Sequence, residues 1–478
     1  MARINTNVAS LYAQQGLAKS QQNLSSTLQR LSSGLRINTG ADDPAGLIAS
    51  EQLRSEISGI NQAVDNSSRA NNVISTAEGA LNEVASLLLN VKSLVVQAAN
   101  SGAMSSDEIQ ANQLQVDSAV QSITRIADTT TFAGLHLING SLDYITSGVN
   151  NNAVKALHIS QANFGTQTTI PVNVNVITSA KPAELTFATS QIASSVTLEI
   201  SGNDGVEVLT FTSGTHASAI AFAVNRVADS TGVSAAYVSA THWQSGINFM
   251  SKGYGSKSFV SVTSQKGGTW STTDAAGANK SRATGGDAVA TVNGAISVGD
   301  GLNIKLNTSG LDVDMTLDKT FGAGQTSFAI TGGGALFQLG PQVSSNQQIN
   351  IGISSVAANK LGDGDVGFLT DIVTGGSSTL VGGKAGTASQ ILERAINQVA
   401  VLRGRLGAFE KNTIQTNMNS LSVALENVTA SESSIRDADF ATETANLTRA
   451  QILTQAGTSV LATANSTPQS VLSLLQGH

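Results

Sequence analysis

The chain has 478 residues, of which 40% are apolar and 12% are charged, and its formal net charge is -7 at pH 7. This length allows two to four domains with hydrophobic cores of their own. The low charge and the lack of a basic cluster argue against nucleic acid as a partner, and the absence of cysteine excludes a disulfide framework and thiolate metal sites.

The start of the chain predicts a soluble protein without a cleaved secretory signal. Arg3 is not followed by an apolar run of the length that such a signal needs. No stretch of the chain approaches a membrane-spanning run of apolar residues, since even the triplet Leu87 to Leu89 ends at Asn90. We therefore expect no membrane insertion. If the chain leaves the cell, we expect an export route that does not depend on a signal peptide.

The segment that follows predicts a helix with one apolar stripe. Its leucines step by seven, four, three and four residues, at Leu17, Leu24, Leu28, Leu31 and Leu35. This spacing places them on one face of a helix. An isolated helix is only marginally stable in water, so we expect a second helix to cover this stripe.

Residues 32–46 predict a joint between two helices. Gly34 and Gly40 can each end a helix, and Asp43 before Pro44 fits an N-cap residue followed by proline at the first helical position. Helical periodicity resumes after the joint, first at Leu87, Val91, Leu94 and Ala98 and then at Ile109, Val116, Val120, Ile123 and Ala127.

The middle of the chain predicts turn-rich β structure. Residues 140–387 hold 34 of the 46 glycines, both tryptophans and 10 of the 13 phenylalanines. Alternating residues on both sides of the turn at 202–205 predict a β-hairpin. Strand or short-helix patterns follow one another at 196–212, 217–228, 233–238, 288–317 and 337–353. We interpret this region as one or two small α+β modules inserted into a helical rod.

The C-terminal part returns to helix. One apolar series is Leu392, Ala395, Val399, Leu402, Leu406 and Phe409, and it continues almost directly into Ile414, Met418, Leu421, Leu425 and Val428. The last series is Leu453, Ala456, Val460, Ala464, Thr467, Val471 and Leu474. Ser466 and Thr467 before Pro468 predict a capped restart of the helix, with a kink in one continuous helix as the alternative. Apolar stripes at both ends predict either self-association or an ordinary intramolecular helical bundle.

Long motifs at the two ends resemble those of bacterial flagellins. At the N-terminal end they are residues 32–47 (SSGLRINTGADDPAGL), 130–135 (TTFAGL) and 137–140 (LING). At the C-terminal end they are residues 426–441 (ENVTASESSIRDADFA), 451–456 (QILTQA) and 468–475 (PQSVLSLL). Residues 196–238 are also similar, more loosely, to a short module of flagellins and filament-cap proteins.

The resemblance implies a multidomain α+β fold, in which long terminal α-helices form coiled-coil or rod domains and one or two β-rich α+β modules are inserted in the middle. Residues 1–36 would be the N-terminal inner-tube helix and 437–478 the C-terminal inner-tube helix. Residues 37–150 would form the N-terminal part of the outer-tube rod domain. Residues 336–436 would supply a strand segment and the C-terminal outer-tube helices, and 151–335 a surface-exposed, β-rich insert.

The resemblance also implies a function outside the cell. The chain would be a structural subunit that polymerises into the bacterial flagellar filament for motility, and its terminal helices would pair on assembly at the distal tip. The implied partners are other copies of the chain in a helical homopolymer, the flagellar export apparatus, an export chaperone, and the cap and hook-junction proteins. The alternative is a hook-filament junction protein or a surface adhesin of flagellin-like fold.

We assign polymerisation to residues of the two ends and of the joint, namely Leu24, Leu28, Leu31, Leu35, Arg36, Asp43, Leu453, Val460, Val471, Leu474 and Leu475. The simpler interpretation of Arg36 and Asp43 is that they are solvated cap and turn residues. The resemblance also aligns one segment with the patch that the flagellin-sensing Toll-like receptor of animals recognises: Leu89, Asn90, Val91, Lys92, Ser93, Leu94 and Gln97. Asn90 and Ser93 stand where a charged pair is usual in strongly recognised flagellins, so we expect weakened recognition.

No catalytic, cofactor or metal site is predicted, and we expect a protein that is not an enzyme. The five histidines form no His-Glu-x-x-His motif. Lys384 is followed by Ala385, which lacks the hydroxyl that a phosphate-binding loop needs. The acidic residues Asp363, Asp365 and Asp371 do not have the ligand spacing of a calcium loop, so a tight acidic turn is the expected structure.

Overall fold

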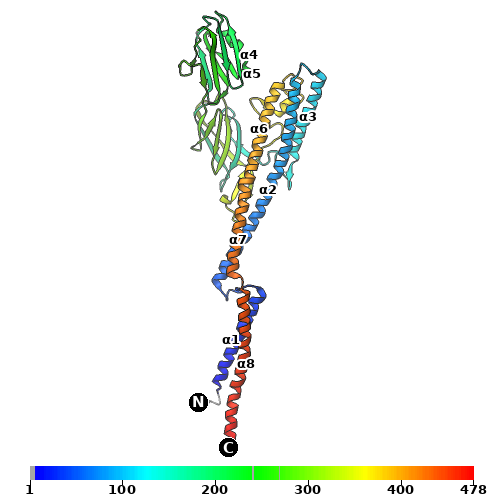
Figure 1. The fold of residues 1–478 in the computed structure, drawn as a ribbon, viewed down its shortest axis with the longest axis vertical. Coiled ribbons are helices and arrows are strands. Elements are labelled where there is room, and N and C mark those ends of the chain that lie inside the picture. Colours follow the sequence, from blue (N-terminus) through cyan, green and yellow to red (C-terminus); the bar gives the residue numbers. More distant parts are fainter. Residues whose placement is uncertain (1–5, 240–241, 269, 478) are drawn as a thin grey trace. The chain divides into compact units, whose positions relative to one another are not determined.

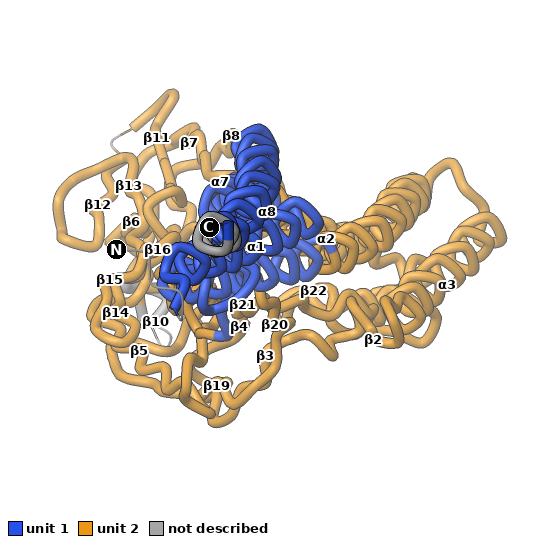
Figure 2. The backbone as a smooth tube through the Cα atoms, turned by 90° about the horizontal axis from the view of Figure 1, so that it is seen from below, with its two compact units in different colours: residues 1–68, 339–343, 414–478 blue, residues 69–338, 344–413 orange. Residues whose placement is uncertain are grey.

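The computed structural model describes residues 6–239, 242–268 and 270–477, with the backbone alone at 239, 242–245, 468–469 and 471–476 (Figure 1). The chain forms two compact units (Figure 2). The first comprises Met1–Ser68, Leu339–Val343 and Ile414–His478, and the second comprises Arg69–Gln338 and Ser344–Thr413.

Long helices occupy the two ends of the chain, as predicted. They are α1 (Val8–Ser33), α2 (Pro44–Ala99), α3 (Ser106–Thr129), α6 (Ala385–Phe409), α7 (Thr416–Arg436) and α8 (Phe440–Gln476). A π-helical segment, η3 (Glu410–Gln415), joins α6 directly to α7. Because the predicted apolar series steps by five residues from Phe409 to Ile414, a π-turn, which bonds residue i to i+5, accommodates that step.

Helix α2 is buried along one face for most of its length. Its buried residues step alternately by three and four, at Ile60, Ala63, Ser67, Ala70, Ile74, Ala77, Leu81, Val84, Leu88, Val91, Val95 and Ala98. Two predicted stripe positions are therefore wrong by one residue, since Leu88 and Val95 are fully buried where Leu87 and Leu94 were expected. Among the described residues α2 is also the one helix long and apolar enough to cross a membrane. Its one-sided burial is typical of a helix that packs against protein.

In the second unit, α3 and α6 lie beside the C-terminal part of α2 (Figure 1). The buried side chain of Gln113, on α3, fastens the irregular segment that precedes α6: its Nε2 donates to the carbonyl of Ile372 at 2.8 Å, and its Oε1 accepts from the N–H of Leu380 at 2.8 Å. Gln398, on α6, exchanges hydrogen bonds of 2.9 and 2.7 Å with the backbone of Gly362. The short elements of this region are β1 (Thr131–Phe132), β2 (Leu135–His136), β22 (Gly362–Asp363), β23 (Gly367–Phe368), η1 (Ser345–Gln347) and η2 (Leu369–Ile372).

The middle of the chain is β-rich, as predicted, and it forms two modules. The first β module has a five-stranded sheet of order β15-β14-β5-β19-β3 and a six-stranded sheet of order β16-β17-β18-β4-β21-β20. Its strands are β3 (Tyr144–Ser147), β4 (Val154–Ala162), β5 (Ile170–Thr178), β14 (Val289–Val292), β15 (Ala295–Ile296), β16 (Val298–Asp300), β17 (Asn303–Asn307), β18 (Leu311–Leu317), β19 (Gly324–Gly333), β20 (Ala335–Gln338) and β21 (Gln348–Ile351). Alternate residues of β5 and β18, such as Val174 and Val313, meet in one core between the sheets.

The nested β module is inserted into the first one. Its sheets have the orders β12-β6-β10-β9 and β13-β11-β7-β8. Its elements are β6 (Pro182–Phe187), β7 (Val196–Ser201), β8 (Val206–Phe211), α4 (Ala217–Arg226), α5 (Ala228–Thr231), β9 (Val233–Ser239), β10 (His242–Tyr254), β11 (Phe259–Gly267), β12 (Thr273–Asp274) and β13 (Arg282–Thr284). Strands β7 and β8 pair from Val196 with Phe211 to Ser201 with Val206, which confirms the predicted hairpin.

A compact joint connects the two β modules. The chain enters the nested module after β5 and leaves it before β14, and Lys181 and Gly286 exchange backbone hydrogen bonds of 2.8 and 3.0 Å between these two segments. The carboxylate of Asp287 accepts hydrogen bonds from the backbone N–H of Ser256 at 2.8 Å, from its hydroxyl at 2.6 Å, and from the N–H of Gly301 at 2.9 Å. The hydroxyl of Ser256 and these N–H groups lower the pKa of Asp287, because they stabilise its charged form.

Replacing Asp287 with alanine is expected to loosen this joint. Loss of its hydrogen bonds should destabilise the joint by roughly 1 to 2 kcal/mol and raise the rate of limited proteolysis at residues 178–182 and 284–288. Because the folded-state pKa of Asp287 is lowered, its contribution is present at neutral pH and is lost as the pH falls through that lowered pKa. The control is Asp300→Ala, which removes an exposed partner of Lys257. Equal cleavage of Asp287→Ala and the unmodified chain at pH 7 would contradict this role.

Candidate functional site

The terminal helices α1 and α8 pair with each other along their length (Figure 1). Leu17, Leu24 and Leu31 of α1, seven residues apart, are half-buried in this pair. On α8 the inner face carries small residues, of which Ala450 is buried and Gly457 lies against Leu17. A Cβ at position 457 would stand 3.3 Å from Leu17 Cδ1, so glycine allows the two helices to approach closely.

Polar contacts hold one end of this helix pair. The side-chain amide of Asn7 donates to the carbonyl of Ala464 at 2.7 Å, and the hydroxyl of Ser10 donates to the side-chain oxygen of Asn465 at 2.7 Å. Helix α8 runs through position 468 without a break. The predicted capped restart at Pro468 is therefore wrong, because the hydroxyls of the two residues before it bond back to the carbonyl of Thr463.

The outer faces of the same two helices expose large apolar side chains. Tyr12 is 72% exposed, Val460 58% and Leu453 49%. Among the described side chains of these helices, the exposed large apolar residues are Val8, Leu11, Tyr12, Leu28, Phe440, Ile452, Leu453 and Val460. Helix α8 thus has an inner face that meets α1, while Leu453 and Val460, seven residues apart, remain exposed outside that face. Several large apolar side chains exposed on one helix pair are typical of a protein-protein contact surface.

The structure separates the predicted polymerisation residues into three groups. Leu24 and Leu31 belong to the inner face of the pair, whereas Leu28, Leu453 and Val460 belong to the outer face. Leu35, Arg36 and Asp43 lie in the joint after α1. The side chains of Val471, Leu474 and Leu475 lie outside the described residues. Sequence periodicity missed Val8, Leu11 and Tyr12, whose apolar character is visible in the sequence but which lie too near the start of the helix to show a repeat.

The joint ties the end of α1 to the start of α8 through backbone hydrogen bonds. Gly34 ends α1 in the left-handed conformation, with φ 72°, as predicted, whereas Gly40 lies in the turn beyond it. The N–H of Arg36 donates to the carbonyl of Arg436 at 2.7 Å, and the N–H of Ala438 donates to the carbonyl of Gly34 at 2.9 Å. The guanidinium of Arg36 donates to the carbonyl of Ile435.

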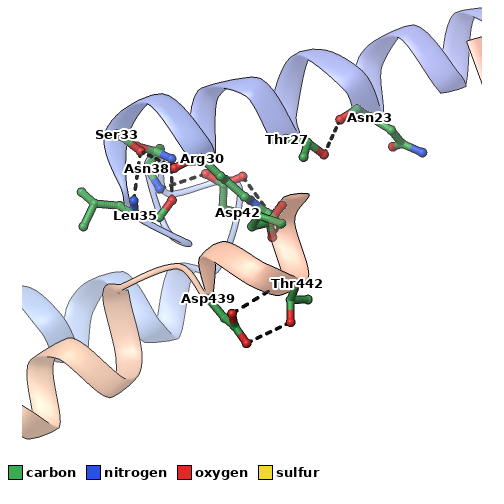
Figure 3. A network of polar contacts seen from close by, with 10 residues as sticks. Asn23, Thr27, Arg30, Ser33, Leu35, Asn38, Asp42, Asp439 and Thr442 are labelled. Atoms are coloured by element: carbon green, nitrogen blue, oxygen red, sulfur yellow. Dashed lines mark hydrogen bonds and ion pairs between the residues drawn. The ribbon is translucent and has the colours of Figure 1, made fainter. Parts of the chain in front are cut away.

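Acidic side chains shape the two turns of the joint (Figure 3). Asp42 accepts hydrogen bonds from the N–H and the hydroxyl of Thr39, at 2.9 and 3.0 Å, and the N–H of Thr39 is the main cause of its lowered pKa. Asp439 caps α8, accepts from the hydroxyl of Thr442 at 2.9 Å, and has a pKa lowered chiefly by that hydroxyl. Asp43 caps α2, as predicted, since it accepts from the N–H of Gly46 at 2.9 Å.

Ion pairs connect residues that are far apart in the sequence. Arg30 lies 3.5 Å from Glu443 and 3.8 Å from Asp42. Arg436 lies 2.8 Å from Glu51 and is the main cause of that carboxylate's lowered pKa. Glu443 is only 7% exposed, and its Oε1 lies 3.5 Å from Nη1 of Arg30. No sequence pattern could have indicated this pair.

The segment aligned with the receptor patch lies on α2 and presents only part of its residues. Leu89, Asn90, Ser93 and Gln97 are exposed, Leu94 is half-buried and Val91 is fully buried in the helical core. Lys92 is turned toward α6, where its Nζ lies 2.8 Å from the hydroxyl of Ser389 and 2.5 Å from a carboxylate oxygen of Glu393.

The predicted acidic turn is confirmed. Asp363 accepts hydrogen bonds from the N–H groups of Asp365 and Val366, at 3.1 and 2.8 Å, inside the β22–β23 hairpin. Within the described residues no group of three or more histidine, aspartate or glutamate side chains is arranged to hold a metal ion.

Comparison with known proteins shows a match along the whole chain. Residues 4–143 match the bacterial flagellin N-terminal helical region, 389–475 the bacterial flagellin C-terminal helical region, and 197–253 the flagellin hook IN motif. The chain is 31% identical to B-type flagellin of Pseudomonas aeruginosa and 29% identical to flagellin of Salmonella rubislaw, with 99% of both chains covered in each case. A solved structure of Xanthomonas campestris FlgL aligns with 78% of this chain and 99% of its own, at 14% identity, but the TM-score of 0.26 is too low to support an argument.

Proposed function

Because this chain belongs to the bacterial flagellin family and is a structural subunit of the flagellar filament, we propose that its helices α1 and α8 are the elements that join each subunit to its neighbours. The observation that carries this proposal is the apolar outer face of a helix pair whose inner face is already occupied. Burial of one such side chain contributes about 1.5 to 3 kcal/mol. A contact between unlike faces of identical subunits generates a helical filament when its rotation does not close into a ring.

The predicted residues then take different parts in assembly. Leu24 and Leu31 hold the helix pair, and Leu28, Leu453 and Val460 contact neighbouring subunits. The polymerisation role of Val471, Leu474 and Leu475, whose side chains lie outside the described residues, stays a prediction. Leu35, Arg36 and Asp43 set the geometry of the joint. Two contacts support this role: Leu35 pairs with Asp437, and Asp43 caps α2.

We assign the parts of the chain to the layers of the filament as the family plan implies. Residues 1–36 and 437–478 form the inner tube, 37–150 and 336–436 contribute to the outer tube, and 151–335 form the surface-exposed insert. The bridge between Leu35 and Asp437 falls where both inner-tube segments meet their outer-tube continuations, which supports these two boundaries.

Flagellins form a filament outside the cell, and this chain works there. We infer that the chain reaches the filament tip through the flagellar export apparatus with an export chaperone, without a cleaved signal peptide, and that it meets the cap and hook-junction proteins there. The exposed face of Leu89, Asn90, Ser93 and Gln97 is the surface that an innate receptor of the Toll-like type would contact. The missing charged pair at Asn90 and Ser93 should weaken that recognition.

Electron microscopy of purified chain added to short filament fragments tests the proposal. Full-length protein is expected to elongate the fragments. Failure to elongate, together with the formation of defined small complexes, would contradict the proposal and favour a hook-filament junction protein.

A further inference from the structure

The nested β module contains a cleft that lies outside the helices to which we assign filament assembly. It has a volume of about 350 Å³ and lies between β11 and the segment that leads to β13. Its lining includes Thr263, Ser264, Trp270, Ser271, Asn279 and Ser281. This volume is at the lower end of the range that small-molecule sites occupy.

Trp270 gives the cleft an aromatic wall. Its ring stacks on Phe187, with centroids 4.0 Å apart and an angle of 11° between the planes, and it meets the edge of Phe249 at 6.1 Å. These contacts fix the indole in place. Its Nε1–H is buried and has no hydrogen-bond partner in the described structure. The indole therefore contributes ring surface to the cleft, and not this buried N–H.

The remaining polar groups of the cleft are neutral or neutralised. Lys280 lies 2.7 Å from Asp274, so its charge is already balanced. Hydroxyl and amide groups remain, and some of them bond locally: the hydroxyl of Ser271 donates to the side chain of Asn279 at 3.3 Å. Within the described structure the hydroxyls of Thr263 and Ser264 have no such partner. Groups of this kind both donate and accept hydrogen bonds.

An aromatic wall next to several neutral hydroxyl and amide groups suits a ligand with both C–H faces and hydroxyls. Sugars have this combination, because their C–H groups pack on aromatic rings while their hydroxyls exchange hydrogen bonds with the lining. The balanced charge of Lys280 disfavours an anionic ligand. We propose that this cleft binds a neutral monosaccharide at the end of a glycan chain.

This activity would be additional to assembly and would gain from it. A single small cleft is expected to bind a monosaccharide weakly. A filament repeats the same cleft on every subunit, so a surface that carries many glycans would be held by many clefts at once, with an avidity far above the single-site affinity. The cleft itself lies within one module, so binding by the unassembled chain does not depend on the filament contacts proposed for α1 and α8.

Tryptophan fluorescence tests the proposal directly. The chain has two tryptophans, so a Trp243→Phe background leaves Trp270 as the reporter. We expect a saturable change in its emission when the full chain is titrated with the methyl glycosides of galactose, glucose, mannose or N-acetylglucosamine. Thr263→Val keeps the side-chain shape but removes the hydroxyl, and it should weaken binding about tenfold. The matched control is Thr210→Val, on β8 and outside the cleft, which should leave the affinity unchanged.

A second variant tests the aromatic wall. Trp270→Phe retains a ring against Phe187 but removes part of the indole surface that lines the cleft, and calorimetry should show weaker binding while the thermal midpoint confirms folding. No saturable response to any of the four glycosides, or wild-type affinity in the correctly folded Thr263→Val and Trp270→Phe variants, would overturn the proposal. Binding of sialic acid alone would overturn the neutral class.

Immobilised glycans test whether the cleft binds a monosaccharide attached at the end of a glycan chain, and not only the free sugar. Filaments should be retained on glycans that end in the bound monosaccharide, and the free methyl glycoside should displace them. Response to the free glycoside without retention on any glycan would overturn the assignment to glycans. Elongation of filament fragments by the same variants is expected to be normal, so failure of sugar binding can be distinguished from failure of the assembly proposal.

Discussion

Removal of residues 440–478 is expected to abolish the elongation of filament fragments while both β modules stay folded. The truncation deletes all of α8, and with it the partner of α1 and the outer apolar face of that helix. Helix α1 alone has no neighbour to cover Leu17 and Leu24, so it should lose most of its helical structure. The buried residues that form the cores of the β modules lie between residues 144 and 330, so the deletion removes none of them.

Two measurements check this result. Electron microscopy should show fragments of unchanged length after incubation with the truncated chain, whereas the full-length chain lengthens them. Near-ultraviolet circular dichroism, which reports the packing of tryptophan and tyrosine, should be nearly the same for both proteins. Elongation by the truncated chain would refute the part assigned to α8, and loss of the near-ultraviolet signal would show that the modules depend on it.

Substituting Leu453 and Val460 together with serine should raise the critical concentration for assembly more than a hundredfold. Each apolar side chain that becomes buried contributes about 1.5 to 3 kcal/mol, so losing two weakens the subunit contact by roughly 3 to 6 kcal/mol. Both residues are about half-exposed in the single chain. The α1–α8 pair should therefore survive the change. Loss of assembly with an intact helix pair would show that the exposed residues of α8 act in subunit contacts, whereas its inner face acts in the pairing with α1.

Sedimentation of assembled protein measures the critical concentration, and far-ultraviolet circular dichroism measures the helix content. The matched control replaces two exposed polar residues of the same helix, Gln451 and Gln455, with serine, and it should assemble almost normally. A critical concentration equal to that of the unmodified chain would show that Leu453 and Val460 do not contact a neighbouring subunit.

Local sequence signals predicted the elements and their ends well. Asp43 and Pro44 open α2 as an N-cap residue and a first helical proline. Gly34 closes α1 because only glycine adopts its positive φ without strain. In each case residues close in sequence determine the structure, so periodicity and capping rules are sufficient.

Periodicity and capping rules cannot predict contacts between segments that are distant in the sequence. Periodicity alone does not show that Ala450 and Gly457 of α8 face α1 while Leu453 and Val460 remain exposed. The pairing of Arg30 with Glu443 joins residues 413 positions apart. The polar cleft beside Trp270 likewise forms only when the sheets of the nested module pack together.

The way the chain enters and leaves the nested module has a consequence for how this protein can vary. Lys181 and Gly286 are hydrogen-bonded neighbours, so the 104 residues between them begin and end at almost the same point in space. A different folded segment whose own ends lie close together could replace them and leave the first module, the helical parts and the terminal pair undisturbed. The nested module is therefore exchangeable as one unit. If residues 151–335 form the filament surface as proposed, that surface can diversify in sequence while the assembling ends stay the same.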